Sequence, residues 1–120
     1  MPGLQYKLLA AADDVRPFPN GHAEVVHVDE TTVARVIYEP GWRWSRDLAP
    51  IMGTPTCQLH HFGYSVSGVM HVAMDDGLSL DIPQGCVFEI PQGHDAWVIG
   101  DEGFVAFEFE PRAVETYARQ

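Results

Sequence analysis

The sequence has few basic residues and no long hydrophobic run. Lysine and arginine total 7 of the 120 residues, against 17 aspartates and glutamates, which gives a formal net charge of −10. Nucleic acids and anionic membrane surfaces attract basic patches, so this charge argues against both as partners. No segment approaches the ~20 apolar residues of a membrane span, and the N-terminus lacks the charged-then-apolar profile of a signal peptide. We therefore expect a cytoplasmic protein.

Cysteine is scarce as well. The two residues, Cys57 and Cys86, are too few for a disulfide scaffold, which agrees with a cytoplasmic location. Cys86 is expected to pack as a small buried apolar residue. Cys57 either does the same or has a chemical role, and at this point both interpretations are open.

Turn residues recur roughly every 8–12 residues and no long helical pattern is present, which is typical of an all-β sandwich or barrel. With 120 residues the chain is long enough for one domain with its own core. We expect an N-terminal arm over residues 1–22, a β-barrel over 23–111, and a C-terminal tail over 112–120 that can form a short helix.

The predicted strands cover residues 25–28, 32–38, 69–74, 78–82, 87–90 and 104–109. Leu78, Leu80 and Ile82 alternate with polar residues, so their strand is expected to have one buried face. The sequence Asp75–Gly77 before this strand predicts a tight hairpin, because glycine supplies the positive φ that the turn requires. An isolated small barrel has sheet edges to protect, so we expect a homodimer with residues 32–38 as the candidate contact strand.

A candidate metal site follows from one cysteine and two histidines. In a strand, residues i, i+2 and i+4 share a face, so Cys57 and His61 are expected to point the same way and His60 the other way, unless a bulge exchanges the two histidines. His94 follows the turn Pro91–Gly93 and would supply a third ligand. Thiolate and imidazole both suit zinc, and imidazole also suits iron and nickel. The alternative is that all three side chains are simply packed in the core.

These residues lie in segments that resemble the two motifs of the cupin superfamily, over residues 32–110. Gly85, Pro91 and Gly93 match the glycine and proline spacing of the second motif, but Ala96 stands at its histidine position and Gly100 at its asparagine position. Counting back from Gly68, the glutamate position of the first motif holds His61. The two histidine positions of that motif hold Cys57 and Pro55. The usual set of three histidines and one glutamate is therefore replaced here.

The resemblance implies a double-stranded β-helix, or jelly-roll barrel, whose mouth holds the site and a divalent metal: zinc, iron, nickel or manganese. It also implies a small-molecule ligand or substrate. The candidate pocket-lining residues are Trp44, Tyr64, Phe88, Trp97 and Phe107, although large side chains are also what fills the core of a small barrel. Asp95 could orient a histidine or cap the turn.

Two classes of function remain open. The protein is a metal-dependent enzyme of oxygenase, isomerase or lyase type, or it is a non-catalytic barrel that binds or senses a small ligand without metal. No carboxylate is expected to face the cavity. Glu89 is expected to face solvent, and Glu108 lies on the strand face opposite to Phe107 and Phe109. This weakens an oxygenase centre, which needs two histidines and one carboxylate.

Overall fold

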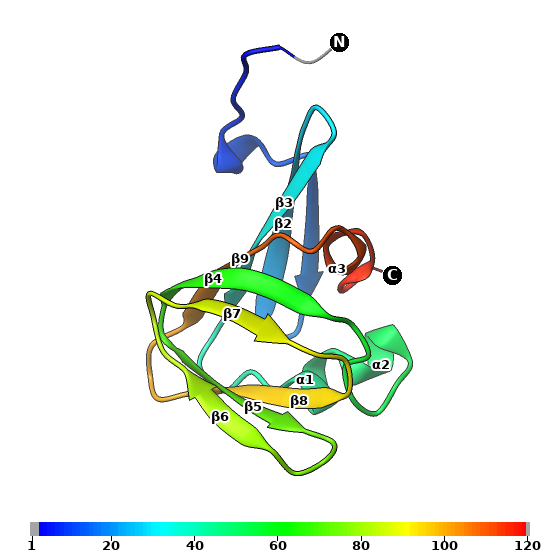
Figure 1. The fold of residues 1–120 in the computed structure, drawn as a ribbon, viewed down its shortest axis with the longest axis vertical. Helices are drawn as coiled ribbons and strands as arrows, with labels where there is room; N and C mark the ends of the chain where they lie inside the picture. Colours follow the sequence, from blue (N-terminus) through cyan, green and yellow to red (C-terminus); the bar gives the residue numbers. More distant parts are fainter. Residues whose placement is uncertain (1–2, 120) are drawn as a thin grey trace.

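Two antiparallel sheets enclose a common core in the computed structural model, which describes residues 3–119. The larger sheet has the strand order β1-β2-β3-β9-β4-β7 and the smaller one β6-β5-β8. Figure 1 shows the smaller sheet beneath the end of the larger one, with the hairpin of β2 and β3 extending away from the barrel. The strands are β1 (Asp14–Phe18), β2 (Gly21–Val28), β3 (Thr31–Tyr38), β4 (His61–Ser67), β5 (Val69–Met74), β6 (Ser79–Ile82), β7 (Val87–Ile90), β8 (His94–Ile99) and β9 (Phe104–Glu108). The expected jelly-roll barrel is confirmed.

Short helices complete the chain. They are η1 (Leu9–Ala11), α1 (Trp44–Asp47), α2 (Ala49–Met52) and α3 (Pro111–Thr116). The tail expected over 112–120 contains α3, whose N-terminus is capped by the Glu110 carboxylate accepting from the backbone N–H of Arg112. No helix among the described residues has the length and hydrophobicity needed to span a membrane.

The core follows from strand alternation, since every second side chain of β3, β4, β8 and β9 is buried. Trp42, Trp44 and Phe104 are the largest fully buried side chains. The predicted hairpin is present: β5 pairs with β6, and Gly77 has a φ of 98°.

The burial expected for β6 is only partly right. Ile82 is buried, but Leu78 and Leu80 are 71% and 59% exposed. The prediction fails for these two leucines because β6 is an edge strand of the smaller sheet, and an open groove of about 340 Å³ lies over them. Alternation identified a shared face but could not show that part of this face has no covering element.

Two further expectations differ from the structure. Residues 14–22, placed in an N-terminal arm by the sequence, form β1 and the start of β2 in the larger sheet; residues 1, 2 and 120 lie outside the described part. Residues 32–38 were the candidate contact strand, but β3 pairs with β2 on one side and β9 on the other. Both edges of β3 are therefore already hydrogen-bonded, and it cannot add a strand from a second copy.

The C-terminal segment closes one end of the barrel. Nη1 of the buried Arg16 donates to the carbonyl oxygens of Val114 and Tyr117, at 2.6 and 3.1 Å. This holds Tyr117 against the core, where its ring meets that of His61 edge-on at 5.4 Å.

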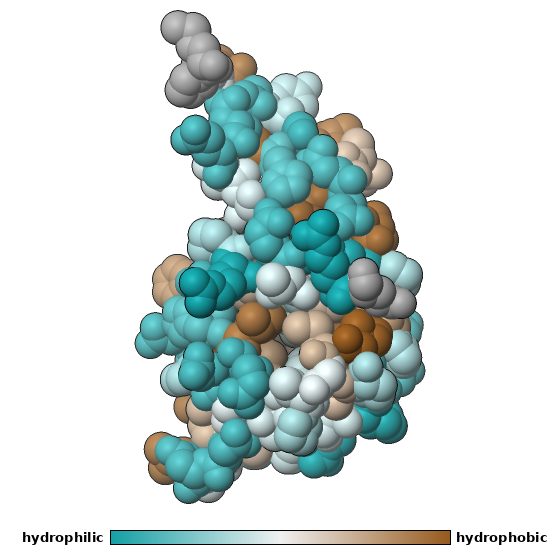
Figure 2. Space-filling view, turned by 90° about the vertical axis from the view of Figure 1, so that its right-hand side faces the viewer, coloured by the Kyte–Doolittle hydropathy of each residue, from teal (hydrophilic) through white to brown (hydrophobic). Residues whose placement is uncertain are grey.

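Figure 2, which views the side that carries α2 and α3, shows a small group of hydrophobic residues at mid-height on a mostly hydrophilic face.

Candidate metal centre

Cys57, His61 and His94 converge in the interior of the barrel. One ligand atom from each, a sulfur and two ring nitrogens, lies within 4.8 Å of the other two. The Cys57 Sγ to His61 Nε2 distance is 3.3 Å, and the rings of His61 and His94 are 5.3 Å apart. All three residues are buried, with exposed fractions of 0, 7 and 3%. The structure thus brings together the three residues that the sequence singled out.

The turn that ends at Gly93 positions His94, and backbone pairing with this turn positions Cys57. His94 is the first residue of β8, after Gly93, whose φ of 89° is readily adopted only by glycine. Cys57 lies outside any strand but forms an antiparallel bridge to His94: its N–H donates to the His94 carbonyl at 2.7 Å, and its carbonyl accepts from Gly93 N–H at 2.7 Å. The expectation that Cys57 and His61 share one strand is wrong, because β4 begins only at His61. Backbone pairing of Cys57 with Gly93 and His94 brings the sulfur into place instead.

Each imidazole ring is oriented by an oxygen atom at its Nδ1 atom. His61 Nδ1 contacts Glu108 Oε2 at 3.1 Å, and His94 Nδ1–H donates to the Pro91 carbonyl at 2.8 Å. Acceptors at both Nδ1 atoms leave the Nε2 atoms to face the site. This arrangement, in which the far ring nitrogen binds a carboxylate or a carbonyl, is the usual setting of metal-binding histidines.

Glu108 is the functional residue that sequence reasoning missed. The prediction that no carboxylate faces the interior is wrong: Glu108 is 7% exposed and accepts from Phe62 N–H at 3.0 Å as well as contacting His61. The alternation in β9 was assigned correctly, but its inner face carries Phe104, Ala106 and Glu108. Phe109, assumed to point inward, is 42% exposed. The sequence shows neither which face of β9 turns inward nor that β4 lies beside β9, so no local signal identifies this glutamate.

The electrostatics couple Cys57 to His61. Burial alone would raise the Cys57 pKa, but hydrogen bonds and charge from His61 and His94 outweigh it and lower the pKa to about 6. Burial alone would lower the His61 pKa, but Cys57 and Glu108 outweigh it and raise the pKa to about 10. The two shifts together favour a thiolate beside a protonated imidazole in the metal-free protein, and a thiolate is the form of cysteine that binds metals.

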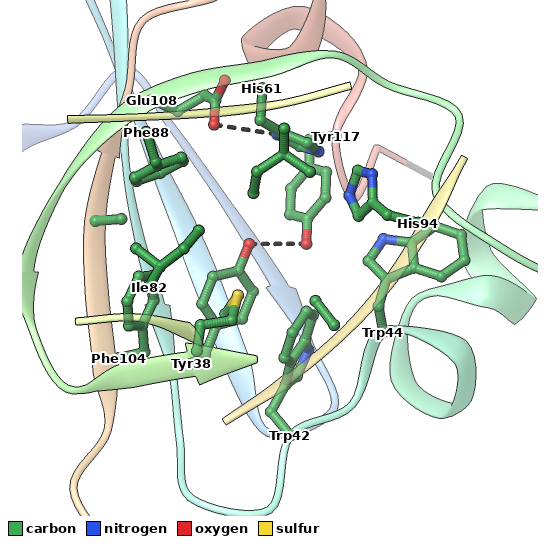
Figure 3. Close-up of a pocket in the computed structure, with 14 residues that line it drawn as sticks. Tyr38, Trp42, Trp44, His61, Ile82, Phe88, His94, Phe104, Glu108 and Tyr117 are labelled. Carbon is green, nitrogen blue, oxygen red and sulfur yellow. Dashed lines mark hydrogen bonds and ion pairs between the residues drawn. The ribbon is translucent and has the colours of Figure 1, made fainter. Parts of the chain in front are cut away.

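A small interior cavity adjoins the two histidines. Its volume is about 30 Å³, and Figure 3 shows His61, His94, Tyr117 and Trp44 arranged around it. Of the five candidate pocket residues, Trp44 and Phe88 line this cavity. The other three, Tyr64, Trp97 and Phe107, do not, and this part of the prediction needs correction.

Alternation along the strands explains why these three residues do not line the cavity. Tyr64 and Phe107 lie at outward positions of β4 and β9, and Tyr64 is 41% exposed. Trp97 lies on the outer face of β8, where its ring stacks between His71 and the guanidinium of Arg43, at 4.6 and 4.2 Å. Asp95, on the same face, accepts from Ser45 N–H and Oγ at 3.0 and 2.9 Å, so it orients neither histidine. His60 pairs with Glu89 and Glu110, away from the site, as expected.

The donor set fits a divalent metal ion. One thiolate and two imidazoles are the ligand types that zinc prefers, and three protein ligands leave one position open in tetrahedral coordination. Glu108 is the only carboxylate among the described residues that line the cavity, and both its oxygens are already hydrogen-bonded. It is therefore placed to orient His61.

Comparisons with known proteins support the fold. No protein-family model matches the chain, and no curated protein matches it. Among solved structures, a cupin-like protein from Thermotoga maritima is 19% identical and has a TM-score of 0.52, with 82% of this chain and 72% of that one covered. KdgF from Halomonas is 21% identical, with a TM-score of 0.53 and coverages of 81% and 86%. Oxalate decarboxylase from Bacillus subtilis is 16% identical with a TM-score of 0.58; the match covers 85% of this chain but 28% of the enzyme.

These identities are too low to transfer a function, but the shared architecture is clear. The TM-scores of 0.52 to 0.58 over more than 80% of this chain show that the overall fold is shared. The predicted resemblance is thus confirmed at the level of the fold: the chain is a cupin-like β-barrel.

Proposed function

We propose that this protein binds one divalent metal ion through Cys57 Sγ, His61 Nε2 and His94 Nε2. The observation that carries the proposal is the convergence of these three buried atoms, with both Nδ1 atoms held by acceptors. A histidine pair that was merely packed would not need two oriented Nε2 atoms facing a sulfur. The packed-core alternative accounts for the Cys57–His61 contact as a buried hydrogen bond, and the metal proposal accounts in addition for the orientation of His94.

Zinc is the ion that the ligands favour. Thiolate sulfur and imidazole nitrogen are its common protein ligands, whereas manganese prefers oxygen. Iron and nickel accept imidazole, but an iron centre of the oxygenase kind adds a carboxylate ligand, and Glu108 is used to orient His61. We therefore propose a zinc centre ahead of an iron or nickel centre.

The proposed chemistry concerns a small molecule at the open coordination position. A zinc ion there supplies Lewis-acid chemistry or activates a water. The protein contributes a small cavity with mostly apolar walls, the Glu108 carboxylate that orients the His61 ring, and two tyrosine hydroxyls, of Tyr38 and Tyr117, that bond to each other at 2.8 Å. This favours an isomerase or lyase type of reaction over an oxygenase. A barrel that binds or senses the same molecule is the non-catalytic form of the proposal.

A second candidate function uses the same side chains without metal. Cys57, His61 and Glu108 are linked by contacts of 3.3 and 3.1 Å, the order of a nucleophile, a base and an orienting carboxylate. However, Cys57 is 0% exposed and is not among the residues that line the cavity. A small molecule in the cavity would meet a metal ion held by His61 and His94 before it could reach the sulfur, and the metal proposal is preferred for that reason.

Metal analysis of the purified full chain tests the proposal. We expect about one zinc per chain in the wild type and its loss in His61→Ala and Cys57→Ala. The matched controls are His60→Ala and Cys86→Ala, which remove the neighbouring histidine and the second cysteine, and both should keep the metal. A metal-free wild type, or equal loss in the His60 and His61 variants with folding intact by circular dichroism, contradicts the proposal.

We also propose that the protein forms a homodimer in the cytoplasm. The support for self-association is the outer surface of the larger sheet, where Phe62, Tyr64 and Val87 are 44, 41 and 69% exposed. These side chains lie next to each other, because Phe62 pairs with Glu89 and Tyr64 with Val87 in the register of β4 and β7. A sheet face therefore replaces β3 as the proposed contact surface.

A further inference from the structure

Two buried indole N–H groups beside the metal centre have no hydrogen-bond partner. Trp42 Nε1 and Trp44 Nε1 are the two unpaired buried side-chain polar atoms found within residues 3–119. Both tryptophans are 1% exposed, and both line the cavity next to His61 and His94. Figure 3 shows Trp44 beside His94, with its nitrogen on the edge of the ring toward the middle of the cavity. An unpaired buried donor costs about 1–3 kcal/mol, so two at one cavity indicate that something binds there.

The tyrosine pair adds a third donor. Tyr38 and Tyr117 each line the cavity, and one hydroxyl donates to the other at 2.8 Å. Two hydroxyls carry two hydrogens, and this bond uses one of them. For the remaining hydrogen, the described part of the chain offers no acceptor.

Few acceptors on the same walls remain free. The Glu108 oxygens already accept from His61 and Phe62, and the polar atoms of His61, His94 and the adjacent Cys57 face the proposed metal. A water molecule could accept from two of the donors and donate to a tyrosine oxygen. A ligand with two acceptor oxygens instead takes a separate hydrogen bond from each indole N–H, and so matches the two unpaired donors directly.

We propose that the cavity binds a small carboxylate whose oxygens accept hydrogen bonds from Trp42 Nε1 and Trp44 Nε1. This inference rests on the proposed metal function, because an ion of charge 2+ would attract the carboxylate to the side of the cavity where the Glu108 carboxyl group and the Cys57 sulfur lie. The carboxylate occupies the side of the metal centre that faces the cavity.

The cavity limits the size of the ligand. A volume of about 30 Å³ gives room for one or two water-sized groups, since one water needs at least about 10–15 Å³ measured in this way. A formate ion, or the carboxylate end of a short acid, matches this space. Several other lining side chains, among them Ile82, Ile90 and Phe104, are apolar, so they shape the cavity without adding charge.

Titration of the zinc-loaded full chain with formate tests the inference, with metal content measured first. By calorimetry we expect formate to bind, and its neutral isostere formamide to bind at least about 10-fold more weakly, because a hydrogen bond to a charged group is the stronger one. Trp42→Phe and Trp44→Phe keep the ring but remove the N–H. Each should weaken formate binding about 10- to 100-fold while the zinc content stays at the wild-type level.

Trp97→Phe is the matched control, since the Trp97 ring lies on the outer face of β8 and should leave formate binding unchanged. A zinc-loaded wild type that does not bind formate overturns the inference, as does equal binding of formate and formamide. Wild-type formate affinity in both Trp42→Phe and Trp44→Phe also overturns it. A chain that holds no zinc at all fails the metal proposal instead, and the prior metal measurement separates that case.

Discussion

Replacing Glu108 by glutamine tests whether the Glu108 carboxylate orients the His61 ring for metal binding. The carboxylate is buried and receives two hydrogen bonds, one from Phe62 N–H and one involving His61 Nδ1, at 3.0 and 3.1 Å. Glutamine has the same shape, but only one of its two terminal atoms can accept. One of the two donors must therefore meet an NH2 group.

Either orientation of the glutamine is unfavourable. If its oxygen faces the fixed Phe62 N–H, its NH2 group faces His61 and favours the tautomer with hydrogen on Nε2, the atom that should bind the metal. If its oxygen faces His61, the Phe62 N–H is left buried without an acceptor, at a cost of about 1–3 kcal/mol. In the first orientation the loss falls on metal affinity, and in the second on stability.

We expect Glu108→Gln to weaken zinc binding about 10- to 100-fold, which corresponds to about 1.4–2.7 kcal/mol. Competition with a chromophoric chelator measures the affinity, and urea denaturation of the metal-free protein measures the stability. Glu89→Gln is the control, since that carboxylate is exposed and pairs with His60 away from the site. If Glu108→Gln binds zinc as tightly as the wild type and is equally stable, then Glu108 does not orient His61 and the geometric argument fails.

Three further outcomes are expected. Because the metal-free pKa values are about 6 for Cys57 and about 10 for His61, zinc binding at pH 7–9 should displace about one proton, from His61. Affinity should then rise about tenfold per pH unit in that range; calorimetry in buffers of different ionisation enthalpy measures this, and a pH-independent affinity would contradict it. Gly63→Ala should destabilise the protein by about 1–3 kcal/mol in urea denaturation, since the new Cβ overlaps the Phe107 carbonyl oxygen; unchanged stability would show that β9 can shift. Sedimentation at micromolar concentration should show a dimer that Tyr64→Asp disrupts, whereas a monomeric wild type would refute the proposed homodimer.

Much of the architecture was predictable from local patterns. The turn at Gly77 and the bounds of β5 and β7 depend on residue types whose backbone preferences act within a few positions. The proximity of His61 and His94 could also be anticipated, but only through the resemblance to cupin motifs. Neither residue has a neighbour in the sequence that would place the two rings together.

The role of Glu108 and the outward position of Trp97 depended on the assembled barrel. Alternation along a strand states which side chains share a face, because successive Cβ atoms point to opposite sides. It does not state which face is covered, since that depends on how the two sheets pack. For β9, two aromatic side chains suggested the wrong inner face, and packing placed a glutamate there instead.

The same distinction applies to the cavity. Composition and periodicity alone predicted an acidic all-β sandwich or barrel with histidines near two turns, because turn chemistry and alternation are local properties. Only the tertiary structure decided how Cys57 joins them, that Tyr117 closes the end, and that two indole N–H groups find no partner among the described residues. Such contacts join segments up to 101 residues apart, as between Arg16 and Tyr117, and they depend on the packing of the whole core.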